Sequence, residues 1–282
     1  MPTKLWLDTD FGGDVDDALA LALVLGSPEI ELAGVSTVYF DSAWRAGAAK
    51  KMLELYGRSE VPVKTGAQKP LLGHWDERRN LNTAEDAPVF TSAESGAEGI
   101  IKACKDFPDI SIAAIGPLTN LAAAIVAAPS AFEGRSVYIM GGDIDNPLHE
   151  WNFMCDPLAA KIALESKAVI KLVGLNVTTQ CAFDDSEVKA FSSSKKPQAA
   201  YLGEMIQNFI RLFNRNPILH DPLSLSPLLW DDVLEFENRP LDFGYEFASS
   251  DSPVEYATEY PVLVATGVKA SLFKKRFLER VL

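Results

Sequence analysis

The feature that most constrains the fold is a regular alternation of short apolar runs with longer, helix-like runs. Runs of strand length are Leu5–Leu7, Glu31–Val38, Val61–Val63, Ile110–Ile115, Ser136–Met140 and Ala168–Leu175. Helix-like runs are Asp16–Leu25, Ala43–Tyr56, Pro117–Ala127 and Asp156–Ser166. Such alternation is typical of a parallel sheet whose crossover helices cover both faces. We therefore predict a single α/β domain over residues 1–282, with an open, mostly parallel sheet and helices on both faces.

The pattern changes after about residue 230. Further strands or hairpins are predicted at Leu234–Phe236, Phe243–Phe247, Val254–Tyr256 and Val262–Ala265. A basic amphipathic helix is predicted to close the chain at Leu272–Val281. Residues 64–95 are polar and are expected to form a long loop over one end of the sheet, and loops of that length are usually functional.

Charge and cysteine usage narrow the class of protein. The chain carries 26 Lys+Arg against 39 Asp+Glu, a formal net charge of −13, so neither nucleic acid nor a membrane is expected as a partner. The 3 cysteines form no zinc or disulfide pattern, which favours a reducing cytoplasm. No apolar run reaches the roughly 18–20 residues of a membrane helix. We expect a soluble cytoplasmic protein, whose acidity suits the binding of a cation.

A dense run of acidic residues lies between the first predicted strand and the first predicted helix. Its carboxylates are Asp8, Asp10, Asp14, Asp16 and Asp17. Ligands of open parallel sheets bind beyond the carboxyl ends of the strands. Like charges packed there repel one another unless a cation lies between them, and oxygen ligands in this number suit Ca²⁺ or Mg²⁺. The alternative is a solvated acidic loop with a helix cap, but a cap needs only one or two acids.

Other polar residues follow other predicted strands. They include Asp41, Thr119, Asn120, Asp143, Asp145, Glu150 and Asn152. His220-Asp221-Pro222 is expected to lie just before a helix, and His220 and Asp221 join this set. If the predicted sheet is right, these side chains meet at one edge of it. We find no Lys or Arg suited to a phosphate among them. The predicted ligand is therefore neutral and rich in hydroxyl groups, such as a sugar or a nucleoside.

Taken together and in this order, these segments resemble the nucleoside hydrolase family, the inosine–uridine preferring N-ribohydrolases. The matching motifs are Asp8-Thr9-Asp10-Phe11-Gly12, Asp16-Asp17-Ala18-Leu19, Gly116-Pro117-Leu118-Thr119-Asn120, Met140-Gly141-Gly142, Glu150-Trp151-Asn152, Asp156-Pro157-Leu158-Ala159-Ala160 and His220-Asp221-Pro222-Leu223. The resemblance implies an open α/β fold, one tightly held Ca²⁺, and hydrolysis of the N-glycosidic bond of ribonucleosides to ribose and free base. It also implies a homo-oligomer, either a dimer or a tetramer.

The resemblance also implies roles for individual residues. The metal ligands would be Asp10, Asp17, Asp221 and the backbone carbonyl of Thr119. The residues that bind the ribose would be Asp16, Asp41, Glu150 and Asn152, with Asp16 sharing the metal site. The general base for a Ca²⁺-activated water would be Asp10, and His220 would stand beside the departing base.

The chain departs from the family pattern in places that bear on these roles. The spacing from Asp10 to the Asp16–Asp17 pair is two residues longer than in the commonest form, so Asp14 is a rival for either role. Asp41 stands where an Asn usually contacts ribose, and Asn146 is a candidate for another expected Asn. The stretch between Thr178 and His220 is shorter than is usual in the family. It normally supplies residues that contact the base, so the base preference stays open, and Trp44, Trp75, Trp151 and Trp230 are possible stacking platforms.

Two other functions are compatible with the sequence. The first is a non-catalytic nucleoside- or ribose-binding protein on the same fold. The second is a haloacid-dehalogenase-like phosphohydrolase, because Asp8-Thr9-Asp10 after a strand suits an aspartate nucleophile with Mg²⁺. That family's motif places Thr or Val where this chain has Gly12.

Overall fold

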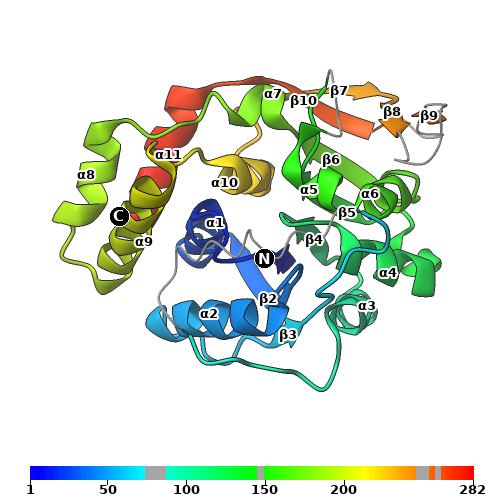
Figure 1. The fold of residues 1–282 in the computed structure, drawn as a ribbon, viewed down its shortest axis with the longest axis horizontal. Coiled ribbons are helices and arrows are strands. Elements are labelled where there is room, and N and C mark those ends of the chain that lie inside the picture. The colour runs from blue at the N-terminus through cyan, green and yellow to red at the C-terminus, as the bar shows by residue number, and fades with distance from the viewer. Residues whose placement is uncertain (74–86, 145–148, 246–253, 258–261) are drawn as a thin grey trace.

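The structure is a computed structural model that describes residues 1–73, 87–144, 149–245, 254–257 and 262–282. Its centre is an 8-stranded sheet with the strand order β3-β2-β1-β4-β5-β6-β10-β7 (Figure 1). The strands are β1 (Thr3–Thr9), β2 (Ile30–Thr37), β3 (Val63–Thr65), β4 (Ser111–Ala114), β5 (Ser136–Met140), β6 (Val169–Val173), β7 (Leu234–Arg239) and β10 (Val262–Val268). Neighbouring strands pair in parallel except β10 and β7, which are antiparallel. The strands β8 (Asp242–Tyr245) and β9 (Val254–Ala257) pair antiparallel in a separate 2-stranded sheet.

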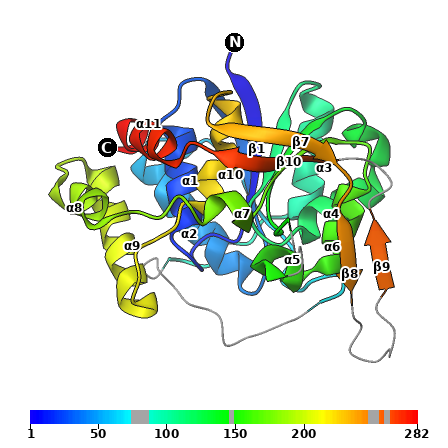
Figure 2. The ribbon, with the colours of Figure 1, turned by 90° about the horizontal axis from the view of Figure 1, so that it is seen from above.

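Helices cover both faces of the sheet (Figure 2). One face carries α1 (Asp16–Leu25), α2 (Ser42–Leu55), α8 (Asp185–Ser193), α9 (Pro197–Phe213), α10 (His220–Leu225) and α11 (Ala270–Val281). The other face carries α3 (Gly96–Asp106), α4 (Thr119–Ala127) and α6 (Pro157–Leu164). The short helices α5 (Trp151–Cys155) and α7 (Leu175–Thr178) follow β5 and β6.

The alternation of side chains along β1 explains why two cores form. Leu5 and Leu7 point into the core beneath α1, whereas Trp6 points into the core beneath α3 and α4. A strand buried on both faces is apolar at successive positions, as Leu5-Trp6-Leu7 is. Helix α1 is buried from Asp16 to Val24, which accounts for its Ala and Leu content on every side.

The predicted α/β fold is confirmed, and the differences are local. The predicted strand at 168–175 ends at Val173, because the chain turns into α7. The helix expected after His220–Pro222 begins at His220 itself. Helix α3 was not predicted, although Ser95 and Glu98 form its capping box and are a readable start signal. Of the strands predicted after residue 230, β7 and β10 extend the main sheet, whereas β8 and β9 pair with each other in a separate sheet.

The order of the strands creates a natural position for a binding site. From β1 the chain proceeds outwards through β2 and β3, and it then returns to β4 on the other side of β1. Ligands of open α/β sheets bind at such a reversal, beyond the carboxyl ends of the strands. Here that position lies where β1 and β4 end.

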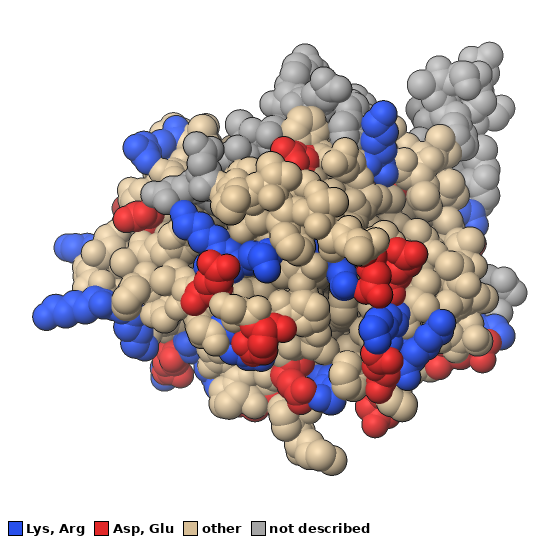
Figure 3. Space-filling view, turned by 90° about the horizontal axis from the view of Figure 1, so that it is seen from below, with Lys and Arg blue, Asp and Glu red and all other residues tan. Residues whose placement is uncertain are grey.

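Two further features are the apolar character of the helices and the distribution of charge on the surface. Among the described residues, no helix combines the length and apolarity needed to cross a membrane. On the face shown in Figure 3, Lys and Arg lie interspersed with Asp and Glu and form no single basic patch.

Candidate active site

The loop between β1 and α1 is held in shape by helix α2. Gly12 adopts φ 97°, and a Cβ there would lie 2.7 Å from the ring of Trp44, so this position requires glycine. The buried guanidinium of Arg45 donates to the backbone carbonyls of Asp10, of Phe11 (3.1 Å) and of Tyr39 (2.9 Å). These bonds fix the backbone that presents the acidic residues.

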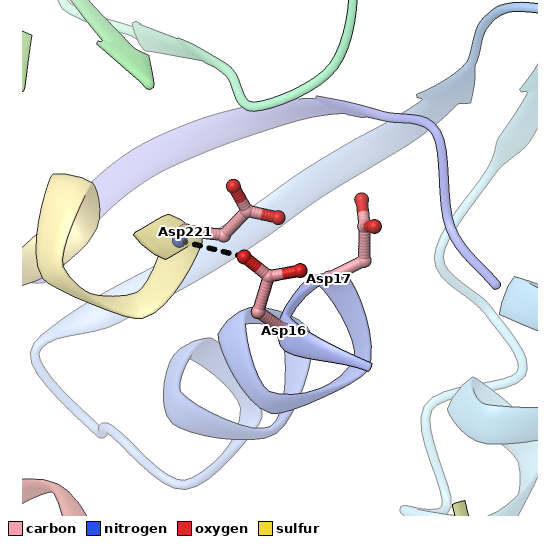
Figure 4. Close-up of side chains that lie close together, drawn as sticks. All are labelled: Asp16, Asp17 and Asp221. Atoms are coloured by element: carbon pink, nitrogen blue, oxygen red, sulfur yellow. Dashed lines mark hydrogen bonds between the residues drawn. The ribbon is translucent and has the colours of Figure 1, made fainter. Parts of the chain in front are cut away.

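Three carboxylates meet where α1 and α10 begin. Asp16 and Asp17 come from the first turn of α1 and Asp221 from the first turn of α10 (Figure 4). One oxygen from each lies within 4.8 Å of the other two, and all three residues are buried. The Asp221 N–H donates to Asp16 Oδ2 at 3.3 Å, and the hydroxyl of Thr9 donates to Asp17 Oδ1.

Burial raises the pKa of each of these three carboxyls well above its usual value, and the neighbouring carboxylates raise the pKa further. A buried group of negative charges is unstable without compensation. The described residues therefore provide a concave set of oxygen ligands that suits a hard divalent cation.

The remaining acids of the segment have different surroundings. Asp10 is half-buried, and a Cβ on Gly116 would lie 2.8 Å from its Oδ1, so its carboxylate lies against the end of β4. Burial raises the pKa of Asp10, and the charge of Arg45 opposes that shift. Asp14 accepts from the Val15 N–H at 2.6 Å and pairs with Arg215 at 3.8 Å. Burial raises the pKa of Asp14 to about 6.

Asp8 lies behind the site and is fully buried. Its Oδ1 accepts from Ser36 Oγ at 2.5 Å and from Asn120 Nδ2 at 2.8 Å, and burial raises its pKa to about 7. Asn120 also donates to the carbonyl of Thr37 and accepts from the Ala67 N–H. Asn120 therefore ties together the ends of β1 and β2 and the segment after β3.

Glu150 and Asn152 come from the start of α5. Glu150 caps this helix and accepts from the N–H groups of Gly142 (3.0 Å), Asn152 (2.8 Å) and Phe153 (3.1 Å). Burial raises its pKa to about 7, although these bonds oppose the shift. Asn152 Nδ2 donates to the carbonyls of Ile115 (3.0 Å) and Met140 (3.1 Å), so its side chain joins the ends of β4 and β5.

His220 begins α10 and is adjacent to Asp221. Its Nδ1 lies 2.8 Å from Thr178 Oγ1. Burial, aided by the charge of Arg215, lowers the pKa of His220 to about 4.

A cavity of about 360 Å³ brings most of these residues together. Of the residues predicted from the sequence, the cavity is lined by Asp10, Asp14, Asp16, Asp17, Glu150, Trp151, Asn152, His220 and Asp221. Asp41 and Thr119 are not among the lining residues. Asp41 caps α2 by accepting from the Trp44 N–H at 3.1 Å, and the Thr119 hydroxyl donates to Asp156 at 2.7 Å.

A family model described as inosine-uridine preferring nucleoside hydrolase matches residues 5–275. The chain belongs to this family. It is a nucleoside hydrolase, an enzyme that cleaves the N-glycosidic bond of ribonucleosides. The phosphohydrolase alternative loses its basis, since its nucleophile Asp8 is fully buried and is not among the lining residues.

Relatives of this nucleoside hydrolase are named for different bases. The probable uridine nucleosidase 1 of Oryza sativa subsp. japonica is 31% identical over 258 residues, which covers 83% of this chain and 79% of the relative. The pyrimidine-specific ribonucleoside hydrolase RihA of Enterobacter sp. (strain 638) is 30% identical, covering 85% and 83%. Among solved structures, the plant nucleoside hydrolase PpNRh1 has a TM-score of 0.86 at 25% identity, covering 100% of this chain and 99% of that one. A purine-preferring ribonucleoside hydrolase from Gardnerella vaginalis has a TM-score of 0.83 at 26% identity, covering 99% and 98%.

Several lining residues of this nucleoside hydrolase were missed in the sequence. Tyr39 has φ 68°, and its ring meets Trp151 edge-on, with centroids 6.1 Å apart. A positive φ at a non-glycine residue leaves no mark in the sequence. Arg45 and Arg215 also line the cavity, although no Lys or Arg was expected among the site residues. An Arg within the small, apolar face of α2 was the available signal for Arg45.

Other candidates named from the sequence lie elsewhere. Trp44 packs beneath Gly12, and Trp230 packs against Phe273. Trp75 and Asn146 lie outside the described residues.

Proposed function

We propose that this nucleoside hydrolase binds Ca²⁺ with Asp16, Asp17 and Asp221 and uses it to hydrolyse ribonucleosides to ribose and free base. The observation that carries the proposal is the buried carboxylate group with ligand atoms within 4.8 Å of one another. Carboxylate oxygens without nitrogen or sulfur ligands favour Ca²⁺ or Mg²⁺ over zinc. We propose Ca²⁺ rather than Mg²⁺, because Ca²⁺ binds more protein oxygen ligands and several carboxylates are available here.

Asp10 and a backbone carbonyl are proposed to complete the ligand set. Asp10 lines the same cavity, and its carboxylate lies beside Gly116. The resemblance points to the carbonyl of Thr119, but Thr119 does not line the cavity. Ile115, the residue just before Gly116, does line it. We therefore favour the carbonyl at the end of β4 over that of Thr119.

Asp10 is proposed as the general base. When bound, Ca²⁺ supplies Lewis acidity that favours loss of a proton from water, and positive charge for the ribose hydroxyls. The Asp10 carboxylate lies at the cavity wall and takes the proton of the attacking water. Attack at the anomeric carbon passes through an oxocarbenium-like state, which the surrounding carboxylates stabilise. Direct attack by water inverts the configuration at that carbon.

Glu150, Asn152 and Asp16 are proposed to hold the ribose. The amide nitrogen of Asn152 is committed to two strand-end carbonyls, so its carbonyl oxygen is the group that accepts from a ribose hydroxyl. Glu150 is fixed by three backbone N–H groups and keeps one orientation. Asp41 is not proposed in this role, because it caps α2 instead.

His220 is proposed to assist the departing base. Because its Nδ1 is engaged with Thr178, Nε2 is the nitrogen available to the base. His220 and Asp10 line the same cavity, and we propose that they act on opposite sides of the anomeric carbon.

A panel of ribonucleosides tests the proposal, with release of free base followed by chromatography. We expect hydrolysis with Ca²⁺, loss of activity with a chelator, and recovery when Ca²⁺ is added back. Asp17→Asn should lose activity and calcium dependence, whereas Asp231→Asn, which removes an exposed carboxylate, should not. Activity that survives exhaustive chelation would contradict the metal proposal. Calcium-dependent ribose binding without turnover would favour the non-catalytic alternative.

Location and assembly are further proposals. The 3 cysteines are buried and free, which supports a reducing cytoplasm. We propose a homodimer or homotetramer, and light scattering of the purified protein measures its mass directly.

A further inference from the structure

Arg215 and Asp14 form an ion pair inside the cavity that the proposed reaction does not use. Arg215 follows the end of α9, and Asp14 lies in the loop between β1 and α1. Arg215 NH2 is 3.8 Å from Asp14 Oδ2, and both residues line the cavity. The pair therefore connects two walls of the cavity that are far apart in the sequence.

Aromatic rings hold the guanidinium of Arg215 from a second direction. Its central carbon lies 4.9 Å from the ring centre of Phe209 and 5.8 Å from that of Phe213. Cation–π contacts and one ion pair fix a guanidinium while leaving most of its five N–H donors for a ligand. Among the described lining residues the other arginine is Arg45, which is committed to loop carbonyls.

The exposed fractions of the lining residues indicate that Arg215 lies on the side of the cavity where the base would sit. Asp16, Asp17 and Asp221 are 5%, 2% and 3% exposed, so the ribose hydroxyls that reach the cation enter deepest. The side chain of Arg215 is 45% exposed, which places it at the mouth. His220, the residue assigned to the departing base, lines the same cavity as Arg215.

We propose that Arg215 recognises a keto oxygen of the nucleobase and that Asp14 positions it for this contact. The inference rests on the proposed function. It assigns to Arg215 and Asp14 a preference for 6-oxopurine and 4-oxopyrimidine ribonucleosides, the inosine and uridine type after which the family is described. A guanidinium has donors and no acceptor, so it pairs with a keto oxygen and opposes an exocyclic amino group. The departing base also gains negative charge, part of it on that oxygen, and the guanidinium stabilises this charge in the transition state.

A phosphate is the other group that a guanidinium commonly binds. It fits this site poorly, because Asp14 lies beside Arg215 and the acidic group lies deeper in the same cavity. A nucleotide would therefore bring further negative charge against carboxylates. The keto oxygen of a neutral base avoids that repulsion.

The test compares inosine with purine riboside, which lacks the 6-keto oxygen, using the whole protein with Ca²⁺. In Arg215→Gln we expect kcat/KM to fall about 10–100-fold on inosine and less than about 3-fold on purine riboside. Each variant is compared with wild type on the same substrate, so the different reactivities of the two leaving groups cancel. Arg211→Gln is the matched control, because Arg211 lies on α9 and outside this cavity.

Asp14→Asn separates positioning from recognition. We expect a smaller loss in the same direction, mainly through a higher KM for inosine, with little change on purine riboside. Because Arg215 and Asp14 are partly exposed, both variants should melt within a few degrees of wild type.

Three results would overturn the assignment. Equal losses on both substrates in Arg215→Gln would show that Arg215 does not contact the keto oxygen. Faster cleavage of uridine 5′-monophosphate than of uridine, abolished in Arg215→Gln, would show a phosphate site instead. No hydrolysis of any nucleoside by the wild-type protein with Ca²⁺ would refute the proposed function itself, and this assignment with it.

Discussion

Removal of Ca²⁺ is expected to destabilise the protein more at pH 8 than at pH 5. Two unit charges 4.8 Å apart repel by about 3.5 kcal/mol at an effective dielectric constant of about 20. The metal-free group of Asp16, Asp17 and Asp221 therefore retains protons, as their raised pKa values indicate. The unfolded chain releases the same protons near pH 4. Stability of the metal-free protein thus falls as the pH rises above that value towards the folded-state pKa values.

The size of this effect follows from the protonation of the three carboxylates at each of the two pH values. At pH 5 the group keeps its protons, and protons also compete with the cation. At pH 8, forcing a second carboxylate to ionise beside the first costs about 3.5 kcal/mol in the absence of the cation. At about 2–4 °C per kcal/mol, chelation should lower the melting temperature by about 10 °C more at pH 8 than at pH 5.

Calorimetry with and without a chelator measures this difference directly. Asp8 and Glu150 also have raised pKa values, but their pH dependence is present in both conditions and cancels in the comparison. Asp17→Asn should reduce the extra loss of melting temperature that chelation causes at pH 8, and Asp231→Asn should leave this loss as in wild type. The reasoning is refuted if chelation lowers the melting temperature equally at both pH values.

Three further substitutions probe individual contacts. Asp10→Asn should lower kcat by a factor of about 100 or more at saturating Ca²⁺ while leaving the fold intact, and turnover at the wild-type rate would remove Asp10 as the base. His220→Ala should slow cleavage of inosine much more than that of p-nitrophenyl riboside, whose leaving group needs no proton; equal losses would contradict this role. Asn120→Ala removes bonds to Asp8 and Ala67 and should cost about 2–4 kcal/mol in urea unfolding, whereas a change below about 0.5 kcal/mol would show that these bonds contribute little.

Local patterns allowed much of the sheet and the acidic loop to be predicted. Leu5–Leu7 reads as a strand because it is apolar on both faces, and Asp16 and Asp17 suit a helix start because the helix dipole favours acids there. The arrival of Asp221 beside them depends on packing across the whole domain. The presence of Asp221 in the site was predicted only from the order of the family motifs, because spacing says nothing about residues so far apart in the sequence.

Where the structure differs from what the sequence suggested, the reasons are local and physical. Asp41 both follows a strand and precedes a helix, and in the structure its side chain caps that helix. Arg215 belongs to no motif, and its ion pair with Asp14 joins residues that are far apart in the sequence. Tyr39 faces the cavity because two successive residues, Tyr39 and Phe40, take positive φ angles. Such angles are unusual for aromatic residues and could not have been anticipated.

The contacts of the buried Arg45 have a consequence for how the proposed cation would bind and dissociate. Its guanidinium binds three carbonyl groups of the surrounding backbone, and none of these bonds involves the cation. The loop that begins at Asp10 is thus scaffolded from beneath and retains its course when the ion dissociates. Reloading then requires only loss of protons and entry of the ion, and no refolding of the loop has to precede it.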